Sequence, residues 1–427
     1  MASIFSYLFG NSSEQKDAKQ AASALKPAII DPRRIDMVKS HTIIGSIEPV
    51  SHNSKMLQLV SWLKDSEAAI AKTLLEDGDH LPSHALALRP YCVGGSIAYG
   101  PGCFGTTKPG DPVYVLGDTH GDFETLVSVL DTVLDAARVR GSSNPTVYLL
   151  GDILDRNTDM CAVESAFIMA VMQKALPDQF AEYNSINFGI VKGDHDVALS
   201  YREPYSPAAR FTAGVKPADY CDWLNARLDK NGGREDLTLI GRAWIRLMEE
   251  CPAAAFLDRS GTLLSHGGIP RSDLQEMMAN GVPYIMQTEE AAQDFAWCRM
   301  VDAKNKLLNR SSKTSEIGFG EFESFNALMG GRIKKFIFGH QHPAKGFARF
   351  DKCYQGYDVI CLSSFRNDTA VGGPTVPYFC RVDDNEINVY SMTPAKYVIK
   401  LEESTAVVPA AAPAAPAAKP AAATANK

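Results

Sequence analysis

The sequence lacks any cysteine pattern typical of a disulfide framework or a zinc knot. Nine cysteines are spread over 427 residues, their total is odd, and no two of them form a CxxC pair. We interpret them as reduced thiols of a cytoplasmic protein, most of them small core residues. The amino-terminal segment MASIFSYLFG has no basic residue ahead of its apolar ones and no long apolar core. It therefore does not resemble a secretory signal.

Long runs of a single residue class are also missing. No stretch approaches the ~20 apolar residues that a membrane-spanning helix requires. There is no long run of lysine and arginine, and the net charge is -7. Nucleic acids and anionic membranes are therefore poor candidates as partners. The composition itself, 45% hydrophobic and 22% charged, is that of a globular chain long enough for one large core or two to three average domains.

The hydrophobic pattern divides the chain into four segments. Residues 1–50 are polar and irregular. Residues 51–110 contain an amphipathic helix, with apolar residues at helical spacing from Met56 to Leu74, and then a stretch rich in loops. Residues 111–400 alternate strand-like apolar runs with helical stretches, which is typical of an α/β domain. Residues 401–427 are rich in alanine and proline and cannot bury a core, so we expect a disordered tail.

Five of the strand-like runs lead into short polar clusters that hold aspartate or histidine. The run 113–116 is apolar and continuous, so it predicts a buried strand whose carboxyl end carries the first cluster. Ligands bind at such strand ends in open α/β sheets. A lone histidine after a strand is usually structural, but five clusters with the same order of residue types favour one shared site. The clusters are GDTHGD (Gly117–Asp122), GDILDR (Gly151–Arg156), KGDHD (Lys192–Asp196), SHGG (Ser265–Gly268) and GHQH (Gly339–His342).

The order of these clusters resembles the calcineurin-like metallophosphoesterases, and among them the phosphoprotein phosphatases of the PPP type. That family carries GDxHG, GDxxDRG, GNHE, HGG and a late histidine in the same succession. The similarity covers roughly residues 112–394. The resemblance implies a four-layer αββα fold, in which a β-sandwich is flanked by helices. It also implies a site for two divalent metal ions.

The resemblance further assigns a metal-binding role to six positions and leaves a seventh, His342, open. It implies that the first metal is bound by Asp118 and His120, and that Asp152 bridges both metals. His342 could be a further ligand of the first metal or a surface residue. Oxygen and imidazole ligands without thiolate suit Mn²⁺, with Fe or Zn²⁺ as alternatives. Two such cations clamp phosphoryl oxygens and acidify the water between them, so that hydroxide attacks phosphorus in line. The ligands expected for the second metal are Asp194, His266 and His340.

The resemblance assigns the acid chemistry to the second and third clusters. His195 is the expected general acid, and Asp155 is expected to orient its imidazole. Arg156 is expected to grip the phosphate, because a planar guanidinium pairs with two of its oxygens. A second phosphate-binding arginine is expected, and Arg310 and Arg299 are the candidates.

Several positions depart from the family pattern. Asp194 stands where the family has a metal-binding asparagine, which adds a negative charge beside the second metal. Asp196 replaces a glutamate, and Asn157 replaces a glycine, a mild change because asparagine tolerates left-handed backbone. Phe338 stands where the PPP motif carries arginine. The late active-site tyrosine of the family is not obvious in the segment SSFRND.

Three functions are compatible with this pattern. The favoured function is that of a phosphatase acting on phosphorylated proteins, on phosphoserine or phosphothreonine ahead of phosphotyrosine. The sequence does not identify a regulatory partner. The alternative is a hydrolase of dinucleoside polyphosphates such as diadenosine tetraphosphate, because a related branch has an aromatic-x-Arg-Met stretch similar to Trp297–Met300. The SHGG form of the fourth cluster argues against it. The last is a module that binds phosphorylated ligands after losing catalysis, with Asp194 as the damaging change.

Overall fold

The fold is described from a computed structural model. The predicted irregular segment before residue 49 and the predicted tail after residue 402 lie outside the described residues, and so does Arg310. The structure describes residues 49–76, 92–93, 96–97, 102–105, 111–142, 144–201, 210–230, 233, 238–257, 259–270, 289–304, 315–344, 346–366, 376–393 and 398–402.

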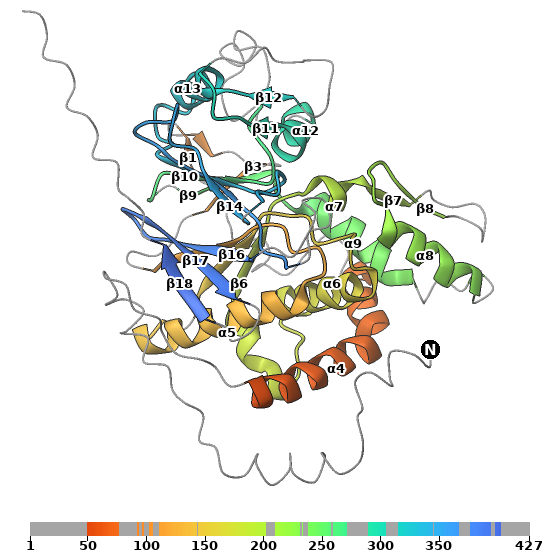
Figure 1. The fold of residues 1–427 in the computed structure, drawn as a ribbon. Coiled ribbons are helices and arrows are strands. Elements are labelled where there is room, and N and C mark those ends of the chain that lie inside the picture. Colours follow the sequence, from red (N-terminus) through yellow and green to blue (C-terminus); the bar gives the residue numbers. More distant parts are fainter. Residues whose placement is uncertain are drawn as a thin grey trace, which may run out of the picture.

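Two six-stranded sheets form the centre of the molecule (Figure 1). The first sheet has the order β18-β17-β16-β4-β5-β6, and β4, β5 and β6 are parallel. The second has the order β14-β15-β13-β10-β9-β3, and β10, β13 and β15 are parallel. The strands of the first sheet are β4 (Val113–Leu116), β5 (Thr146–Leu149), β6 (Asn187–Ile190), β16 (Tyr378–Val382), β17 (Ile387–Thr393) and β18 (Val398–Glu402). Those of the second are β3 (Gly102–Gly105), β9 (Ala254–Leu257), β10 (Thr262–Ser265), β13 (Lys335–Phe338), β14 (Phe347–Arg349) and β15 (Asp358–Leu362).

The side chains of β4 are buried on both faces of the first sheet. Successive side chains of a strand point to opposite faces of the sheet. Val113 and Val115 of β4 therefore join the core between the two sheets, where they meet Leu264 of β10. Tyr114 and Leu116 face the other way, into the core beneath the helices. The predicted sandwich of two sheets flanked by helices is confirmed.

Helices cover the outer face of each sheet (Figure 1). The first sheet packs against α5 (Phe123–Arg140), α6 (Thr158–Met172) and α9 (Leu239–Glu250), and the second against α12 (Glu289–Trp297) and α13 (Phe319–Leu328). The predicted amphipathic helix is α4 (Pro49–Glu76), which packs on α6 and α9 through Leu59, Leu63 and Ile70. The remaining elements are η1 (Asp178–Ser185), α7 (Asp194–Ala198), β7 (Leu199–Tyr201), β8 (Phe211–Ala213), α8 (Asp219–Lys230), β11 (Arg299–Met300) and β12 (Glu316–Ile317).

The stretch expected to be rich in loops contains short strands. They are β1 (Cys92–Val93), β2 (Ser96–Ile97) and β3. β3 pairs in parallel with β9, so the edge of the second sheet precedes the expected boundary at residue 111. At the other end, β18 extends two residues past the expected limit at residue 400. β3 is defined by hydrogen bonds to β9, a partner distant in sequence, which local periodicity does not reveal.

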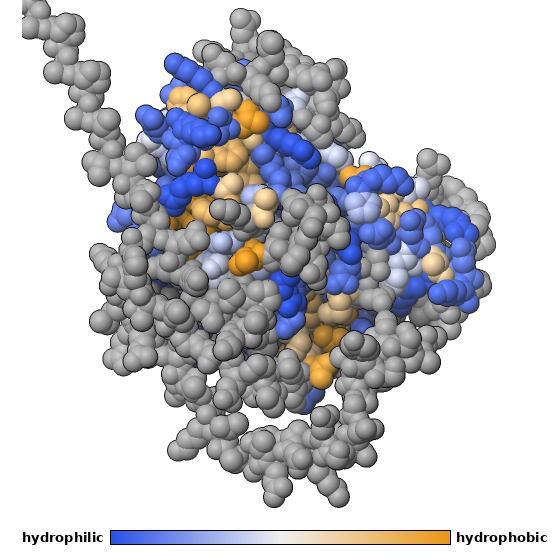
Figure 2. Space-filling view, viewed as in Figure 1, coloured by the Kyte–Doolittle hydropathy of each residue, from blue (hydrophilic) through white to orange (hydrophobic). Residues whose placement is uncertain are grey.

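Two expectations from composition concern cysteines and membrane spans. Seven cysteines are free thiols, and six of these seven are buried. Within the described ranges, no helix combines the length and the apolar character needed to cross a membrane. Figure 2 shows hydrophilic residues over the surface of α8, on the right of the view.

Candidate metal centre

The loops after β4, β5, β6, β10 and β13 meet at one end of the sandwich. Asp118, after β4, forms a parallel β-bridge with Ser363, after β15, so the two sheets join at this point. Three overlapping groups of acids and histidines result, and within each group the ligand atoms lie within 4.8 Å of one another. The groups are Asp118, His120, Asp152 and His342; Asp194, His266 and His340; and Asp152, Asp194 and His195. All seven residues expected to bind metal are therefore brought together, and Asp152 belongs to two groups.

Sharp turns in the backbone place these side chains. Left-handed backbone in a residue other than glycine costs on the order of 1–3 kcal/mol and persists only where the surroundings fix it. Here it lets the chain reverse directly after a strand, so that the side chain faces the shared site instead of following the sheet. Among the described residues it occurs at Lys174 and at six positions of the site: His120, Asp152, Asp155, Arg156, His340 and His342.

Two glycines allow the loops to approach each other closely. A Cβ atom on Gly339 would lie 2.1 Å from Oδ1 of Asp118, and one on Gly193 would lie 2.4 Å from Oδ1 of Asp152. Both distances are well inside van der Waals contact, and both would meet a carboxylate proposed to bind metal. The glycines in KGDHD and GHQH are therefore required by the packing of the site itself.

The imidazoles are oriented by backbone carbonyl groups. Nδ1 of His120 lies 2.7 Å from the carbonyl oxygen of Leu154, and Nδ1 of His266 lies 2.8 Å from that of Leu150. Each Nδ1–H donates to its carbonyl, so each Nε2 is directed at the carboxylates of the site. Nε2 of His120 is buried and has no hydrogen-bond partner among the described residues. This is the arrangement of a histidine prepared to bind a metal ion.

The charges of the site are strongly coupled. Burial opposes ionisation of Asp152, but the charges of His266 and His195 outweigh it and hold the pKa of Asp152 well below its usual range. Burial and Asp152 also oppose ionisation of Asp194, and hydrogen bonds from His266 and His340 lower its pKa to about 2. Both carboxylates are therefore anionic at neutral pH. Buried carboxylates and imidazoles without thiolate suit Mn²⁺, Fe or Zn²⁺, so the residues present fit the expected metals.

The pair expected to supply the general acid is formed. Nδ1 of His195 lies 2.6 Å from Oδ2 of Asp155, whose Oδ1 accepts the backbone N–H of Tyr220 at 2.9 Å. The backbone N–H of His195 donates to Oδ1 of Asp152 at 3.0 Å. Burial disfavours the imidazolium, but the charge of Asp152 and the bond to Asp155 outweigh it and raise the pKa of His195 to about 9. The imidazole thus holds a proton at neutral pH, next to the metal ligands.

Two of the three arginines considered for phosphate binding, Arg156 and Arg299, lie among the described residues, and their surroundings differ. Arg156 is half-buried, its backbone N–H donates to Asp219 at 3.3 Å, and its charge acts on His120. Arg299 is exposed on β11. Its neighbour Met300 exchanges two backbone hydrogen bonds with the side chain of Gln341, which lies in the GHQH cluster. Of these two arginines, Arg156 is the one whose charge acts on a residue of the metal centre.

Asp196 holds the loop of the second cluster. Its carboxylate accepts the backbone N–H groups of Asp152 at 2.7 Å, Ile153 at 3.1 Å and Leu154 at 3.3 Å. These bonds fix the left-handed turn at Asp152. The sequence shows Asp196 only as a variant of the family's glutamate, and this role as an anchor was not predicted.

Arg366 and Phe365 were also missed. The guanidinium of Arg366 binds both carboxylate oxygens of Asp122, with Nη2 2.6 Å from Oδ1 and Nε 2.9 Å from Oδ2. The ring of Phe365 packs edge-on against His120, with centroids 5.0 Å apart, and against His342, with centroids 5.4 Å apart. The segment SSFRND therefore contributes an aromatic ring and an ion pair to the site, in the region where the family tyrosine was expected.

The four-layer fold and the buried acids and imidazoles, able to bind metal ions, define the class of the protein as a hydrolase of phosphate esters. The family model for calcineurin-like phosphoesterases matches residues 111–344. The chain belongs to this family.

Several solved structures are similar to the chain. One is a protein serine/threonine phosphatase from Saccharomyces cerevisiae, 16% identical, covering 78% of this chain and 92% of that one, with a TM-score of 0.48. Another is the cold-active protein-tyrosine phosphatase of a psychrophilic Shewanella species, 16% identical, covering 74% and 84%, with a TM-score of 0.37. A putative diadenosine tetraphosphatase is 15% identical, covering 70% and 100%, with a TM-score of 0.32. No curated protein matches the sequence.

Proposed function

We propose that the protein is a phosphatase that removes phosphate from serine or threonine residues of phosphorylated proteins. The observation that carries the proposal is the 2.6 Å contact between His195 and Asp155 beside the metal ligands. The alkoxide of serine or threonine is a poor leaving group and needs a proton as it departs. A pyrophosphate leaving group needs one far less. A built and oriented acid therefore favours alkyl phosphate esters over dinucleoside polyphosphates.

The two groups of acids and histidines would hold two divalent cations. Asp118, His120 and His342 would bind one, Asp194, His266 and His340 the other, and Asp152 both. When bound, such cations polarise phosphoryl oxygens and lower the pKa of water toward neutrality. We propose Mn²⁺ as the metal, with Fe or Zn²⁺ compatible with the same donors.

The side chains of the chain itself then perform three tasks. The guanidinium of Arg156 pairs with two phosphate oxygens and fixes the orientation of the ester. The imidazole of His195, bound to Asp155 through Nδ1, has Nε2 left to give a proton to the departing oxygen. Asp155 holds the ring in this orientation and stabilises the imidazolium. The carboxylate of Asp155 is itself held in place, because its other oxygen accepts the backbone N–H of Tyr220.

The convergence of the ligands argues against a binding module that has lost catalysis. Asp194 lies with His266 and His340, 3.1 Å from Nε2 of His266 and 3.3 Å from Nδ1 of His340. A carboxylate in this position keeps an oxygen for a cation, as an amide would. We therefore propose that Asp194 is a metal ligand.

A substrate panel tests the proposed function. The protein is loaded with Mn²⁺ and offered peptides containing phosphoserine, phosphothreonine or phosphotyrosine, and diadenosine tetraphosphate. We expect the highest kcat/KM with phosphoserine or phosphothreonine, and a large loss of kcat in His195→Ala. A preference for diadenosine tetraphosphate would replace the proposal by the alternative hydrolase. No hydrolysis of any substrate by fully metal-loaded protein would support the binding module.

A further inference from the structure

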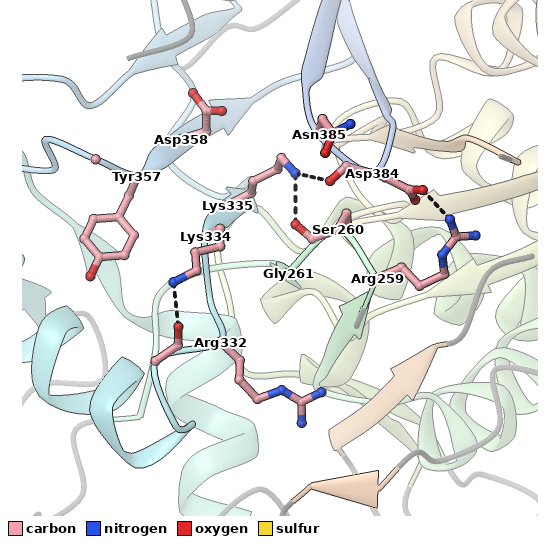
Figure 3. Close-up of a pocket in the computed structure, with 12 residues that line it drawn as sticks. Arg259, Ser260, Gly261, Arg332, Lys334, Lys335, Tyr357, Asp358, Asp384 and Asn385 are labelled. Carbon is pink, nitrogen blue, oxygen red and sulfur yellow. Dashed lines mark hydrogen bonds and ion pairs between the residues drawn. The ribbon is translucent and has the colours of Figure 1, made fainter. Parts of the chain in front are cut away.

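A polar cavity lies away from the metal centre, and Figure 3 shows the side chains that line it. It has a volume of about 610 Å³, and its lining includes Ser260, Lys334, Lys335 and Asp358. These residues lie at the amino ends of β10, β13 and β15. The loops at the carboxyl ends of β10 and β13 carry His266 and His340. At ~3.3 Å per residue, strands of four residues separate the two regions by more than 10 Å.

Two lysines of the cavity are contacted by neutral groups. Nζ of Lys335 donates to the carbonyl oxygens of Ser260 at 2.9 Å and Asp384 at 3.0 Å (Figure 3). Nζ of Lys334 donates to the carbonyl oxygen of Gly331 at 2.8 Å. A carbonyl group satisfies an N–H donor but carries no net charge, so these hydrogen bonds themselves do not neutralise the two ammonium groups. Lys335 is only 5% exposed, which makes such a charge costly.

The acids of the cavity are already engaged by arginines. The carboxylate of Asp384 pairs with Arg259 (Figure 3). That of Asp358 lies 3.5 Å from Nη1 of Arg349. Burial lowers the pKa of Lys335 even though Asp358, Asp384, Asp383 and Glu386 act in the opposite direction. The lining itself has four cationic side chains and two carboxylates: Arg259, Arg332, Lys334 and Lys335 against Asp358 and Asp384.

The backbone leaves room for a ligand beside these charges. A Cβ atom on Gly331 or on Gly356 would meet nothing within 4 Å, and both residues have left-handed backbone, with φ of +68° and +89°. Arg332, which also lines the cavity, has its guanidinium 5.6 Å from the centroid of the Phe256 ring. The cavity therefore has cationic side chains and bare backbone around one open volume.

We propose that this cavity binds a small anion that carries phosphate groups, at a site separate from the metal centre. The volume lies within the ~300–1,000 Å³ usual for small-molecule sites. A doubly charged tetrahedral anion would supply the counter-charge for Lys334 and Lys335 and accept their hydrogen bonds. The site stands independently of the proposed phosphatase activity, because none of its residues belongs to the metal centre.

Tungstate, a tetrahedral dianion that is not hydrolysed, is a suitable probe. Binding is measured by titration calorimetry on the full chain, loaded with metal and freed of excess metal, and anomalous diffraction from crystals soaked in tungstate locates the anion. We expect tungstate in the cavity, with an affinity that falls as salt is added. The double variant Arg332→Gln/Lys334→Gln should weaken this binding at least tenfold. Arg156→Gln should leave it unchanged.

A matched variant controls for the loss of charge. Lys64→Gln/Lys304→Gln removes the same charge from exposed positions on α4 and after β11, and it should bind tungstate in the cavity as the unchanged protein does. Lys334→Gln alone, at an exposed side chain, provides the same test if the double variant unfolds. Tungstate found at the metal centre alone would overturn the proposal. So would cavity binding that the two double variants weaken equally.

Discussion

Replacing Asp155 by asparagine isolates the contribution of one hydrogen bond to the proposed acid catalysis. In the protein, the two oxygens of Asp155 accept from Nδ1 of His195 at 2.6 Å and from the backbone of Tyr220 at 2.9 Å. An asparagine has one oxygen, so it can accept only one of these bonds. If Tyr220 keeps that oxygen, the amide N–H₂ faces Nδ1 and favours the neutral imidazole with its hydrogen on Nε2. The imidazole then loses both its orientation and its stabilised charged form.

The size of the effect follows from the role of the acid. A positioned general acid contributes typically ~10²–10⁴ in rate, which equals about 3–5 kcal/mol of transition-state stabilisation. We expect Asp155→Asn to lower kcat on a phosphoserine peptide by about 10²-fold or more, with little change in KM. With 4-nitrophenyl phosphate, whose leaving group departs without a proton, we expect a loss below about tenfold.

The assay compares the two substrates in Asp155→Asn and in the control Asp219→Asn. Asp219 accepts the backbone N–H of Arg156 at 3.3 Å and neighbours Tyr220 in the chain. The control should therefore affect both substrates equally and mildly. Equal large losses on both substrates in Asp155→Asn would refute the acid role, and so would a loss of bound metal measured by mass spectrometry.

Three further predictions follow from other parts of the structure. Removing divalent metal with a chelator should stop hydrolysis, and adding Mn²⁺ should restore it; full activity of metal-free protein would contradict the site. Burial raises the pKa of Glu164 from 4.5 to about 8, so its contribution to stability is complete below pH 4.5 and is lost as the pH rises through 8. Glu164→Gln should therefore reduce the fall in the free energy of unfolding between about pH 5 and pH 9 by ~2–5 kcal/mol; an unchanged pH dependence in urea unfolding would oppose this. Arg366→Ala leaves Asp122 without its guanidinium and should cost about 1–3 kcal/mol of stability, whereas Arg138→Ala, at an exposed pair on α5, should cost less than about 1 kcal/mol.

Much of the fold was predictable because its strands are short apolar runs that end in glycine. The run 113–116 became β4, and the run ahead of GHQH became β13. Parallel strands bring their carboxyl ends to the same edge, so the convergence of five polar clusters could also be anticipated. Side-chain roles such as that of His195 came from the order of the clusters. These expected roles rest on the pattern of all five clusters together, and no single cluster would have been enough to predict them.

Contacts between distant segments were not predictable. The pair formed by Asp122 and Arg366 joins residues 244 positions apart, and each residue alone resembles an ordinary charged loop residue. The same holds for β3, whose identity as a strand depends on pairing with β9. The exposure of Arg299 on β11 is likewise a result of the tertiary structure that its sequence position does not reveal. Tertiary pairing decides these cases, and it leaves no periodic signal in the sequence.

The acids of the first three clusters look alike in sequence, and the structure separates them by the groups that face them. Asp196 accepts three backbone N–H groups, and both of its oxygens take part in holding the loop of the second cluster. Asp152, Asp194 and Asp118 also face the imidazole of His266, at 3.4, 3.1 and 3.7 Å, although Asp152 and Asp118 accept one backbone N–H group each as well. Such contacts keep oxygen lone pairs directed at the shared site. One kind of carboxylate therefore shapes the loops, and the other is available to a metal that the loops surround.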